Sequence, residues 1–258
     1  PLVTGVQTCA LPICYISNLR ILKGTALYTA NFVPPASPPL PTTANTSLLL
    51  NYTNSGVIDS AYRTTLETVG DARVTTANSK FGTGSYYFDG TDRIVTVPNM
   101  IHSLASGDFT VECWVYPTAV NVGQVIVARA ATNFVSGSDL QYGIYISSSG
   151  QVQMRPYVST TDYTTNIGAI SANTWTHVAF VRSGNTFMGF VNGVKSANTI
   201  TSITGALNDN SAWITYMGYG VLNGSADVPF TGYIDDLRIT RGYARYTANF
   251  RSEEHTSE

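Results

Sequence analysis

The chain is predicted to be all-β, with two antiparallel sheets packed face to face as a sandwich. Short segments that are apolar, or that alternate between apolar and polar residues, recur about every eight to fifteen residues, with Gly, Asn, Asp and Ser between them. Helical periodicity is missing over any useful length, and the 16 Tyr and 10 Phe suit pleated surfaces. Strands of this kind each have an apolar side to bury, and two facing sheets bury it.

One stretch of 18 residues occurs twice. Residues 233–250 read YIDDLRITRGYARYTANF and residues 15–32 read YISNLRILKGTALYTANF, so the copies lie 218 positions apart and are identical at 12 positions. A repeat spaced by a whole domain length indicates a tandem array of similar domains, each closed by this strand and tail. We therefore expect the last strand of one domain in residues 14–32, a linker in 33–46 and a complete domain in 47–250.

The two ends differ in composition from the rest of the chain. Residues 3–13 read VTGVQTCALPI, and residues 251–258 place four charged residues and a His in eight positions of a chain that is 12% charged. Both look like in-frame translations of a sequencing-library adapter, so residues 1–13 and 251–258 are left out of fold reasoning. A disordered natural tail is the alternative. The adapter interpretation predicts that the natural protein continues past both ends.

Charge and cysteine content limit the partners. Without the two ends the chain has 13 basic and 13 acidic residues, so no nucleic-acid partner is expected. No apolar run is long enough for membrane insertion. Of the three Cys, Cys9 lies in the adapter-like end and Cys14 at its junction, so no disulfide framework is expected. Cys113 lies in an apolar strand and is predicted to be buried and inert.

Turn-forming residues and the alternation of apolar and polar residues predict the order of the elements. Five Pro in residues 33–46 favour an extended spacer. The turn signals are Ser148-Ser149-Gly150 and, the strongest, Asn192-Gly193. Residues 109–116 carry large apolar groups on both faces, which predicts a central strand with Glu112 as the exception to explain. Strands are expected at 15–24, 48–52, 67–74, 86–88, 93–97, 109–116, 124–129, 142–147, 151–157, 175–182, 187–191, 213–218 and 230–240.

Four segments occur in one order and at one spacing: FDGTDRIVTVPN, DFTVECWVYPT, WTHVAFVRSGNTFMGFVNGV and GYIDDLRITRG. They resemble the laminin-G-like jelly roll of the concanavalin A-like lectin/glucanase superfamily, over roughly residues 47–250. The tandem copies ending in YTANF resemble repeats of phage tail-fibre and other virion proteins and of secreted bacterial adhesins. The resemblance implies a two-sheet antiparallel jelly roll that works outside the cell or on a virion surface.

Hydrolysis is the first chemistry to weigh, because the superfamily includes glucanases whose carboxylates sit at i, i+2 and i+4 on one strand face. Between the two ends the only Glu are Glu67 and Glu112, 45 positions apart. A glycosidase needs two carboxylates that flank the bond, and this sequence offers no such pair. His102 is expected in a loop and His177 in a buried strand, neither with an assignable partner. We therefore expect no catalytic residues and no enzyme activity.

A structural Ca²⁺ site is the second possibility to weigh, because many jelly rolls of this superfamily hold a Ca²⁺ ion where the first and last strands meet. The residues that would supply oxygen ligands are Asp59, Asp89, Asp235 and Asp236. The first copy of the repeat has Ser and Asn in place of the Asp pair, which argues against a metal common to every repeat. Alternatively, Asp89-Gly90 is a turn and Asp59 hydrogen-bonds within its own loop. No other cofactor is expected.

Sugar binding is the preferred function, because a saccharide site combines flat aromatic area with polar donors and acceptors. Three long loops, residues 132–141, 159–166 and 216–227, supply both kinds of group. Turn chemistry and local packing are the alternative for each residue taken singly. The candidate ligand-binding residues are Phe134, Asp139, Asp162, Tyr163, Tyr219, Asn223 and Asp227.

Tandem repetition favours recognition over catalysis, because linked copies of a weakly binding domain bind with a raised effective concentration. We expect a non-catalytic module that recognises a cell-surface glycan or glycoprotein in a virion fibre or secreted adhesin, beside neighbouring repeats of the same chain. A purely structural spacer in a fibre is the alternative. Residues 15–24, a last strand without its own sheet, are expected to lose the competition with 233–242 for one position. Residues 14–46 are therefore expected to pack poorly, with an unpaired strand edge that invites aggregation.

Overall fold

Strands make up nearly all of the regular structure in the computed structural model. It describes residues 19–24, 26–32, 46–53, 56–59, 66–82, 84–96, 103–131, 139–222 and 225–252, and these stretches contain no α-helix. None of the residues so described therefore belongs to a helix that could span a membrane. The chain divides into two compact units, residues 1–64 and 65–258, which are described separately.

The first unit contains a three-stranded antiparallel sheet in the order β1-β2-β3. Its strands are β1 (Leu19–Leu22), β2 (Thr46–Thr53) and β3 (Gly56–Asp59). The prediction that the first repeat copy lacks a sheet was wrong, because β1 pairs with β2, with Leu19 opposite Leu50. Poor packing of this copy was expected, and all the side chains from 26 to 32 are exposed. The adapter-like residues 1–13 and most of the linker, residues 33–45, lie outside the described residues, and the domain boundary at residue 47 stays a prediction.

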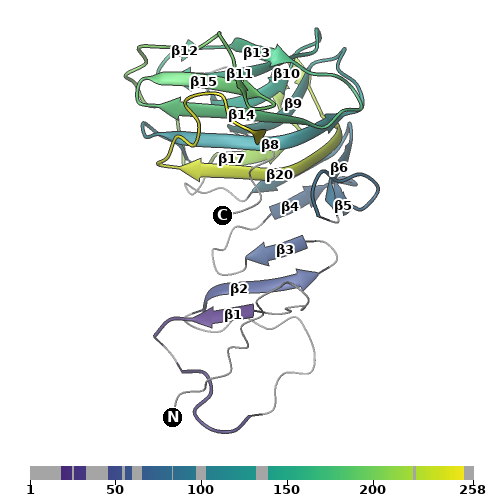
Figure 1. Ribbon diagram of the computed structural model, residues 1–258, viewed down its shortest axis with the longest axis vertical. Coiled ribbons are helices and arrows are strands. Elements are labelled where there is room, and N and C mark those ends of the chain that lie inside the picture. Colours follow the sequence, from purple (N-terminus) through teal and green to yellow (C-terminus); the bar gives the residue numbers. More distant parts are fainter. Residues whose placement is uncertain are drawn as a thin grey trace. The chain divides into compact units, whose positions relative to one another are not determined.

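The second unit is a sandwich whose first sheet has seven antiparallel strands (Figure 1). β8 is central in it, between β14 and β20, as its apolar faces predicted. β20 contains residues 233–241 of the second copy of the repeat, and this copy therefore holds the sheet position that was predicted for it. In spatial order the strands are β16 (Val194–Lys195), β15 (Thr186–Val191), β14 (Thr176–Ser183), β8 (Phe109–Pro117), β20 (Thr231–Arg241), β6 (Ser85–Asp89) and β5 (Arg73–Thr75).

The second sheet has eight strands. Seven of them form one series in which each strand pairs with the next, and β13 (Thr165–Ala169) pairs with β11 outside this series. A separate ribbon joins β18 (Val221–Leu222) and β19 (Ser225–Asp227). In spatial order the series is β12 (Thr161–Asp162), β11 (Gln151–Val158), β10 (Leu140–Ile146), β9 (Gln124–Ala130), β17 (Ile214–Met217), β7 (Arg93–Thr96) and β4 (Leu66–Val69).

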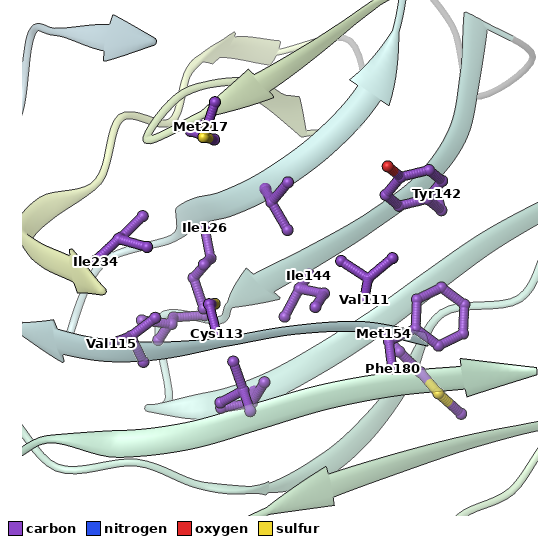
Figure 2. Close-up of a cluster of buried hydrophobic side chains, with 14 of the residues drawn as sticks. Val111, Cys113, Val115, Ile126, Tyr142, Ile144, Met154, Phe180, Met217 and Ile234 are labelled. Carbon is purple, nitrogen blue, oxygen red and sulfur yellow. The ribbon is translucent and has the colours of Figure 1, made fainter. Parts of the chain in front are cut away.

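The main core lies between the two sheets. Figure 2 shows Val111, Cys113 and Val115 of β8 close to Ile126 and Ile144 of the facing sheet, and all five belong to one buried cluster. Cys113 is completely buried, which confirms its predicted burial, and this burial raises the pKa of its thiol. The prediction of a two-sheet antiparallel sandwich is confirmed.

Most predicted strands are present, with two instructive differences. The single strand expected at 67–74 is two strands in different sheets, because the chain turns at Gly70, whose φ is +79°. Strand β13, which pairs with β11, was not predicted, because TNIGA has little apolar content. The Asn192-Gly193 turn is confirmed, with φ positive at both residues.

Candidate functional site

The outer face of the eight-stranded sheet carries tyrosines between two charged edges. Because Tyr142, Ile144 and Ile146 of β10 point into the core, Tyr145 between them points outward. The same alternation turns the flanking side chains of neighbouring strands outward. We call this surface the tyrosine face, and its members are Arg93, Tyr145, Arg155, Tyr157, Asp162, Tyr216 and Tyr219.

An arginine–carboxylate pair marks one edge of the tyrosine face. Nε of Arg155 donates to both carboxylate oxygens of Asp162, at 3.0 and 2.8 Å, and a second guanidinium nitrogen binds the same carboxylate. Thr164 donates its hydroxyl to Asp162 at 2.9 Å. Burial alone would lower the pKa of Arg155, but the hydrogen bond with Asp162 raises it. The Arg155 side chain is 3% exposed and that of Asp162 is 30% exposed, so the carboxylate is the accessible end of a fixed pair.

Three of the four tyrosines are buried, since Tyr145, Tyr157 and Tyr216 are 2%, 9% and 7% exposed, so Tyr219 supplies the accessible ring. A Cβ at Gly143 would overlap the Tyr145 ring, so this ring position requires glycine there. Ala128 and Ala130 of β9 belong to the same buried cluster as the tyrosine rings. The Tyr157 hydroxyl donates to the carbonyl of Thr160 at 3.2 Å. The centre of the face therefore has small residues on β9 and β10 and large rings beside them.

The other edge of the tyrosine face combines an aromatic pair with a cation. The rings of Tyr216 and Tyr219 lie 6.2 Å apart, and the Arg93 guanidinium is 4.6 Å from the Tyr219 ring centroid. Tyr216 donates its hydroxyl to the carbonyl of Ala131 at 3.2 Å. Tyr219 and Arg93 are half-buried, so both keep accessible atoms.

This arrangement suits an extended polar ligand with apolar patches. Four strand spacings separate β12, with Asp162, from β17, which is about 19 Å across the sheet. The accessible Tyr219 ring can stack on the apolar side of a sugar, while the Asp162 carboxylate and the Arg93 guanidinium exchange hydrogen bonds with hydroxyls. A saccharide of several units would span both edges.

The structure brings two of the seven candidate ligand-binding residues, Asp162 and Tyr219, to the tyrosine face. Tyr163 packs instead against the core between the sheets, and Asp139 accepts the Ala131 N–H through its carbonyl. Phe134 and Asn223 lie outside the described residues. Asp227 lies in β19, where no side chain is described. The candidate ligand-binding set therefore remains a prediction.

The described ends of the three predicted loops lie at different ends of the sheet. Residues 139–141 lie beside Ala130 and residues 159–162 follow β11 at the same end, whereas residue 217 lies beside Val127 and Val228 returns to Val125. The sequence interpretation did not identify Arg93, Tyr145, Arg155, Tyr157 and Tyr216. A signal for them exists in β11, where Val152, Met154 and Val158 fill the core and leave Arg155 and Tyr157 outside.

The candidate calcium ligands have other partners where their side chains are described. Asp89 accepts from the N–H and hydroxyl of Thr91, which lowers its pKa, and this is the turn named as the alternative. Asp235 accepts the N–H groups of Lys80 and Phe81. Asp89 lies opposite Thr231 in the pairing of β6 with β20. Thr231 is four residues from Asp235, which is about 13 Å along β20, so Asp89 and Asp235 are too far apart to bind one ion. Asp59 lies in β3 and Asp236 has a positive φ of 47°. In the described stretches no three acidic, His or Cys residues could hold a metal together, so calcium stays a prediction.

Glu112, the acidic residue of the central strand, anchors the C-terminal tail. Its carboxylate accepts the Tyr246 hydroxyl at 2.9 Å, and Nε of Arg245 lies 3.2 Å away. Arg238 and His177 also lie 3.4 Å from it. Glu112 and His177 are both 2% exposed at the side chain, since residues 243–250 cross the outer face of the seven-stranded sheet above them.

Comparisons with known proteins agree on the fold. The sequence profile described as "Concanavalin A-like lectin/glucanases superfamily" matches residues 89–244. No curated protein sequence matches the chain. Domain 4 of AbnA, an extracellular arabinanase from Geobacillus stearothermophilus solved with arabinotriose, is similar with a TM-score of 0.54 and 20% identity, over 72% of this chain and 87% of that one.

Two toxin domains are also similar in structure. The binding domain of botulinum neurotoxin serotype G has a TM-score of 0.55 and 13% identity, over 80% of this chain and 49% of that one. The binding domain of Paraclostridial Mosquitocidal Protein 1 has a TM-score of 0.55 and 14% identity, over 81% and 50%. The chain thus spans about half of each toxin domain, and at these identities the likeness concerns the fold. With the family profile covering more than half of its residues, the chain belongs to the concanavalin A-like lectin/glucanase superfamily.

Proposed function

We propose that the domain is a non-catalytic glycan-recognition module, repeated in tandem in a virion fibre or secreted adhesin. One observation carries the proposal: the tyrosine face combines accessible aromatic area at Tyr219 with the fixed Arg155–Asp162 pair. Domain 4 of AbnA, which shares the fold, was solved with arabinotriose, and this supports a saccharide as the ligand class. Repetition of the closing motif supports an array that raises avidity.

The position of Glu112 supports a binding role over hydrolysis. Its carboxylate is buried below the tail and is engaged with Tyr246 and Arg245. Glu67 lies on β4 of the other sheet. A glycosidase needs two carboxylates on either side of an accessible bond, and these two lie on different layers of the sandwich.

A glycan array, followed by calorimetric titration of the best ligand, tests the proposal. We expect Asp162→Asn and Tyr219→Ala each to weaken binding by about tenfold or more, since each removes one contact to the ligand. The matched controls are Asp71→Asn, which alters an exposed ion pair with Arg73 that is not part of the tyrosine face, and Tyr243→Ala, which removes a 63% exposed tyrosine. Both controls should bind like the wild type.

The competing function, a structural spacer in the fibre, predicts a different result. A folded wild-type protein that binds no glycan on the array would support the spacer and contradict the proposal. Binding that survives both face substitutions would place the ligand elsewhere and contradict the assignment to the tyrosine face.

A further inference from the structure

A row of aromatic side chains crosses the outer face of the seven-stranded sheet. Tyr233 of β20 lies directly opposite Tyr116 of β8 on one side and Tyr87 of β6 on the other. Trp175, just before β14, extends this line beyond Tyr116. Neighbouring ring centroids along the line are 5.3 to 5.8 Å apart. We call these four residues the aromatic row, which strand register assembles from distant parts of the chain.

The aromatic row points away from the core. Phe88, Val115 and Ile234, each next in sequence to a tyrosine of the row, belong to the buried cluster between the sheets. Successive side chains of a strand point to opposite faces, so the three tyrosines point outward. All four members of the row are half-buried and keep accessible atoms. Neighbouring ring planes differ by 50 to 77°, so no ring is covered by a parallel neighbour in the row.

The part of this face beside the row is covered by other segments of the chain. Trp114, two residues before the row on β8, is 3% exposed, and the Phe81 ring lies 5.5 Å from it. Further along β8, Glu112 is 2% exposed at the side chain below residues 243–250. The aromatic row therefore lies where this covering ends.

The hydroxyl groups of the three tyrosines are available to a ligand. Among the residues that the structure describes, none forms a hydrogen bond with the hydroxyl of Tyr87, Tyr116 or Tyr233. The indole N–H of Trp175 donates to Oδ1 of Asn78 at 3.1 Å, which fixes the orientation of that ring. The row thus presents three hydroxyl groups, each able to donate and to accept, on rings held in register.

A row of polar side chains runs beside the aromatic row. Thr118, Thr231 and Asp89 each lie two residues from a tyrosine of the row and so on the same face. Asp89 lies opposite Thr231, and the N–H and hydroxyl of Thr118 both donate to the Thr231 carbonyl, at 2.9 and 3.2 Å. Thr91 gives both of its hydrogen bonds to Oδ1 of Asp89, so Oδ2 of this exposed carboxylate can accept from a ligand.

This combination of groups fits a saccharide better than a proline-rich peptide. A carboxylate only accepts hydrogen bonds, so a ligand that contacts Asp89 needs donors, and sugar hydroxyls supply them. A proline has no backbone N–H and offers no such donor. At the end of the row, the Arg73 guanidinium lies 4.7 Å from the Tyr87 ring centroid and is paired with Asp71. Because this cation is already balanced, the surface favours a neutral ligand.

We propose that the aromatic row and the polar row beside it bind a neutral saccharide chain that lies across strands β14, β8, β20 and β6. Three strand spacings separate β14 from β6, which is about 14 Å, so several sugar units can contact the row. Sugar rings stack on the aromatic side chains, while sugar hydroxyls bond to the phenols and to Asp89. Because this site is on the opposite sheet, it does not depend on ligand binding at the tyrosine face.

The first experiment is affinity electrophoresis of the full chain in gels containing linear arabinan, xylan, mixed-linkage β-glucan or galactomannan, four soluble neutral polysaccharides. We expect at least one of them to retard the wild type. Trp175→Ala and Tyr87→Ala should each weaken this binding by about tenfold or more, since each removes a stacking ring. Tyr233→Phe keeps the ring and should weaken binding only several-fold. Tyr243→Ala, which removes a 63% exposed tyrosine outside the row, should bind like the wild type.

Trp175 provides a second measurement that keeps an aromatic ring in place. It is half-buried, whereas Trp114 and Trp213 are 3% and 8% exposed. A saturating concentration of the retarding polysaccharide should shift the fluorescence maximum to the blue, because the ligand removes the Trp175 indole from water. Trp175→Phe should abolish the shift while weakening binding less than Trp175→Ala does. A shift that persists in Trp175→Phe would place the ligand elsewhere and overturn the proposal.

Three further outcomes would overturn the proposal. One is a folded wild type, as judged by circular dichroism, that none of the four polysaccharides retards. Another is binding that Asp162→Asn weakens and Trp175→Ala does not, which would leave glycan binding at the tyrosine face intact. The third is saturable binding of deca-proline without binding of any polysaccharide, which would assign the row to a proline-rich partner. If Trp175→Ala does not fold, Tyr87→Ala and Trp175→Phe decide the result.

Discussion

At the scale of single residues, a few positions are fixed by close approach of the backbone. Asn192 and Gly193 have φ of 50° and 74°, which is the geometry of the tight hairpin between β15 and β16. The same turn lets the Phe250 carbonyl come against Gly193. One glycine thus serves both a hairpin and the docking of the tail.

Gly193→Ala should destabilise the protein more than a turn glycine that has open space around it. Gly184, with φ of 56° and no heavy atom within 4 Å of where an alanine methyl group would lie, is the matched control. Each alanine brings backbone strain of about 1–3 kcal/mol, and only Gly193→Ala adds steric overlap of similar size. Urea unfolding should show the free energy of unfolding lowered by about 2 kcal/mol more in Gly193→Ala than in Gly184→Ala. Equal losses of unfolding free energy in the two variants would mean that the tail moves aside without destabilising the protein.

The buried phenol of Tyr142 predicts a loss of stability at high pH. Burial raises its pKa above the ordinary value near 10. A group whose folded pKa is raised contributes its full stabilisation below about pH 10 and loses it as the pH rises toward the folded value. The free energy of unfolding should therefore fall above about pH 10, and fall less in Tyr142→Phe. Phenolate absorbance showing Tyr142 ionising together with the exposed Tyr243 would contradict this.

At the scale of elements, two outer segments each have a hydrogen bond to a carboxylate of the seven-stranded sheet. Asp235 of β20 accepts the N–H groups of Lys80 and Phe81 and so fixes loop 78–82. The Phe81 ring lies 5.5 Å from Trp114, and Nζ of Lys80 lies 4.1 Å from it. Glu112 holds the C-terminal tail in the same manner.

Asp235→Ala should release the loop over Trp114. We expect a loss of about 1–3 kcal/mol in the free energy of unfolding, because two backbone donors lose their acceptor. The tryptophan fluorescence maximum should shift to the red as Trp114, now 3% exposed, meets water. Asp235→Asn retains one acceptor oxygen and should lose less. An unchanged spectrum in Asp235→Ala would show that packing alone holds the loop.

Tyr246→Phe should loosen the tail by removing the hydroxyl bonded to Glu112. A hydrogen bond to a buried charged group contributes about 1.5–3 kcal/mol, so the thermal midpoint should fall. Tyr243→Phe is the control, because that side chain is 63% exposed. If both variants melt alike, the Tyr246 hydroxyl does not anchor the tail.

At the scale of the whole molecule, the two units differ in how much they can bury. The second unit has two sheets of seven and eight strands around one core, whereas the first has one sheet of three strands. Small sheets with little core are marginally stable, and stability is not uniform along a chain.

Hydrogen exchange should therefore distinguish the two copies of the repeat. We expect amides in β20 to exchange only by global unfolding and those in β1 to exchange several orders of magnitude faster, as read by mass spectrometry. Equal protection of the two strands would contradict the division into units and the outcome of the competition between copies.

The sequence alone predicted most of the longer strands in the second unit, the central place of residues 109–116, and the hairpin turn at Asn192-Gly193. It could do so because alternation and turn residues are local signals, set by the period of a strand and by the φ that each turn requires. It also identified the repeat, which needs no structure. It missed the split of 67–74 at Gly70, since a single glycine within an expected strand does not say which sheet follows.

Only the tertiary structure decided which side chains meet across strands far apart in sequence. It turned Tyr163 into the core, brought Arg155 and Asp162 together, and placed Glu112 below Tyr246, 134 positions away. The local sequence pattern also could not predict that β1 pairs with β2. The physical reason is that alternation fixes only the face of a strand, whereas strand order and register choose the neighbours on that face.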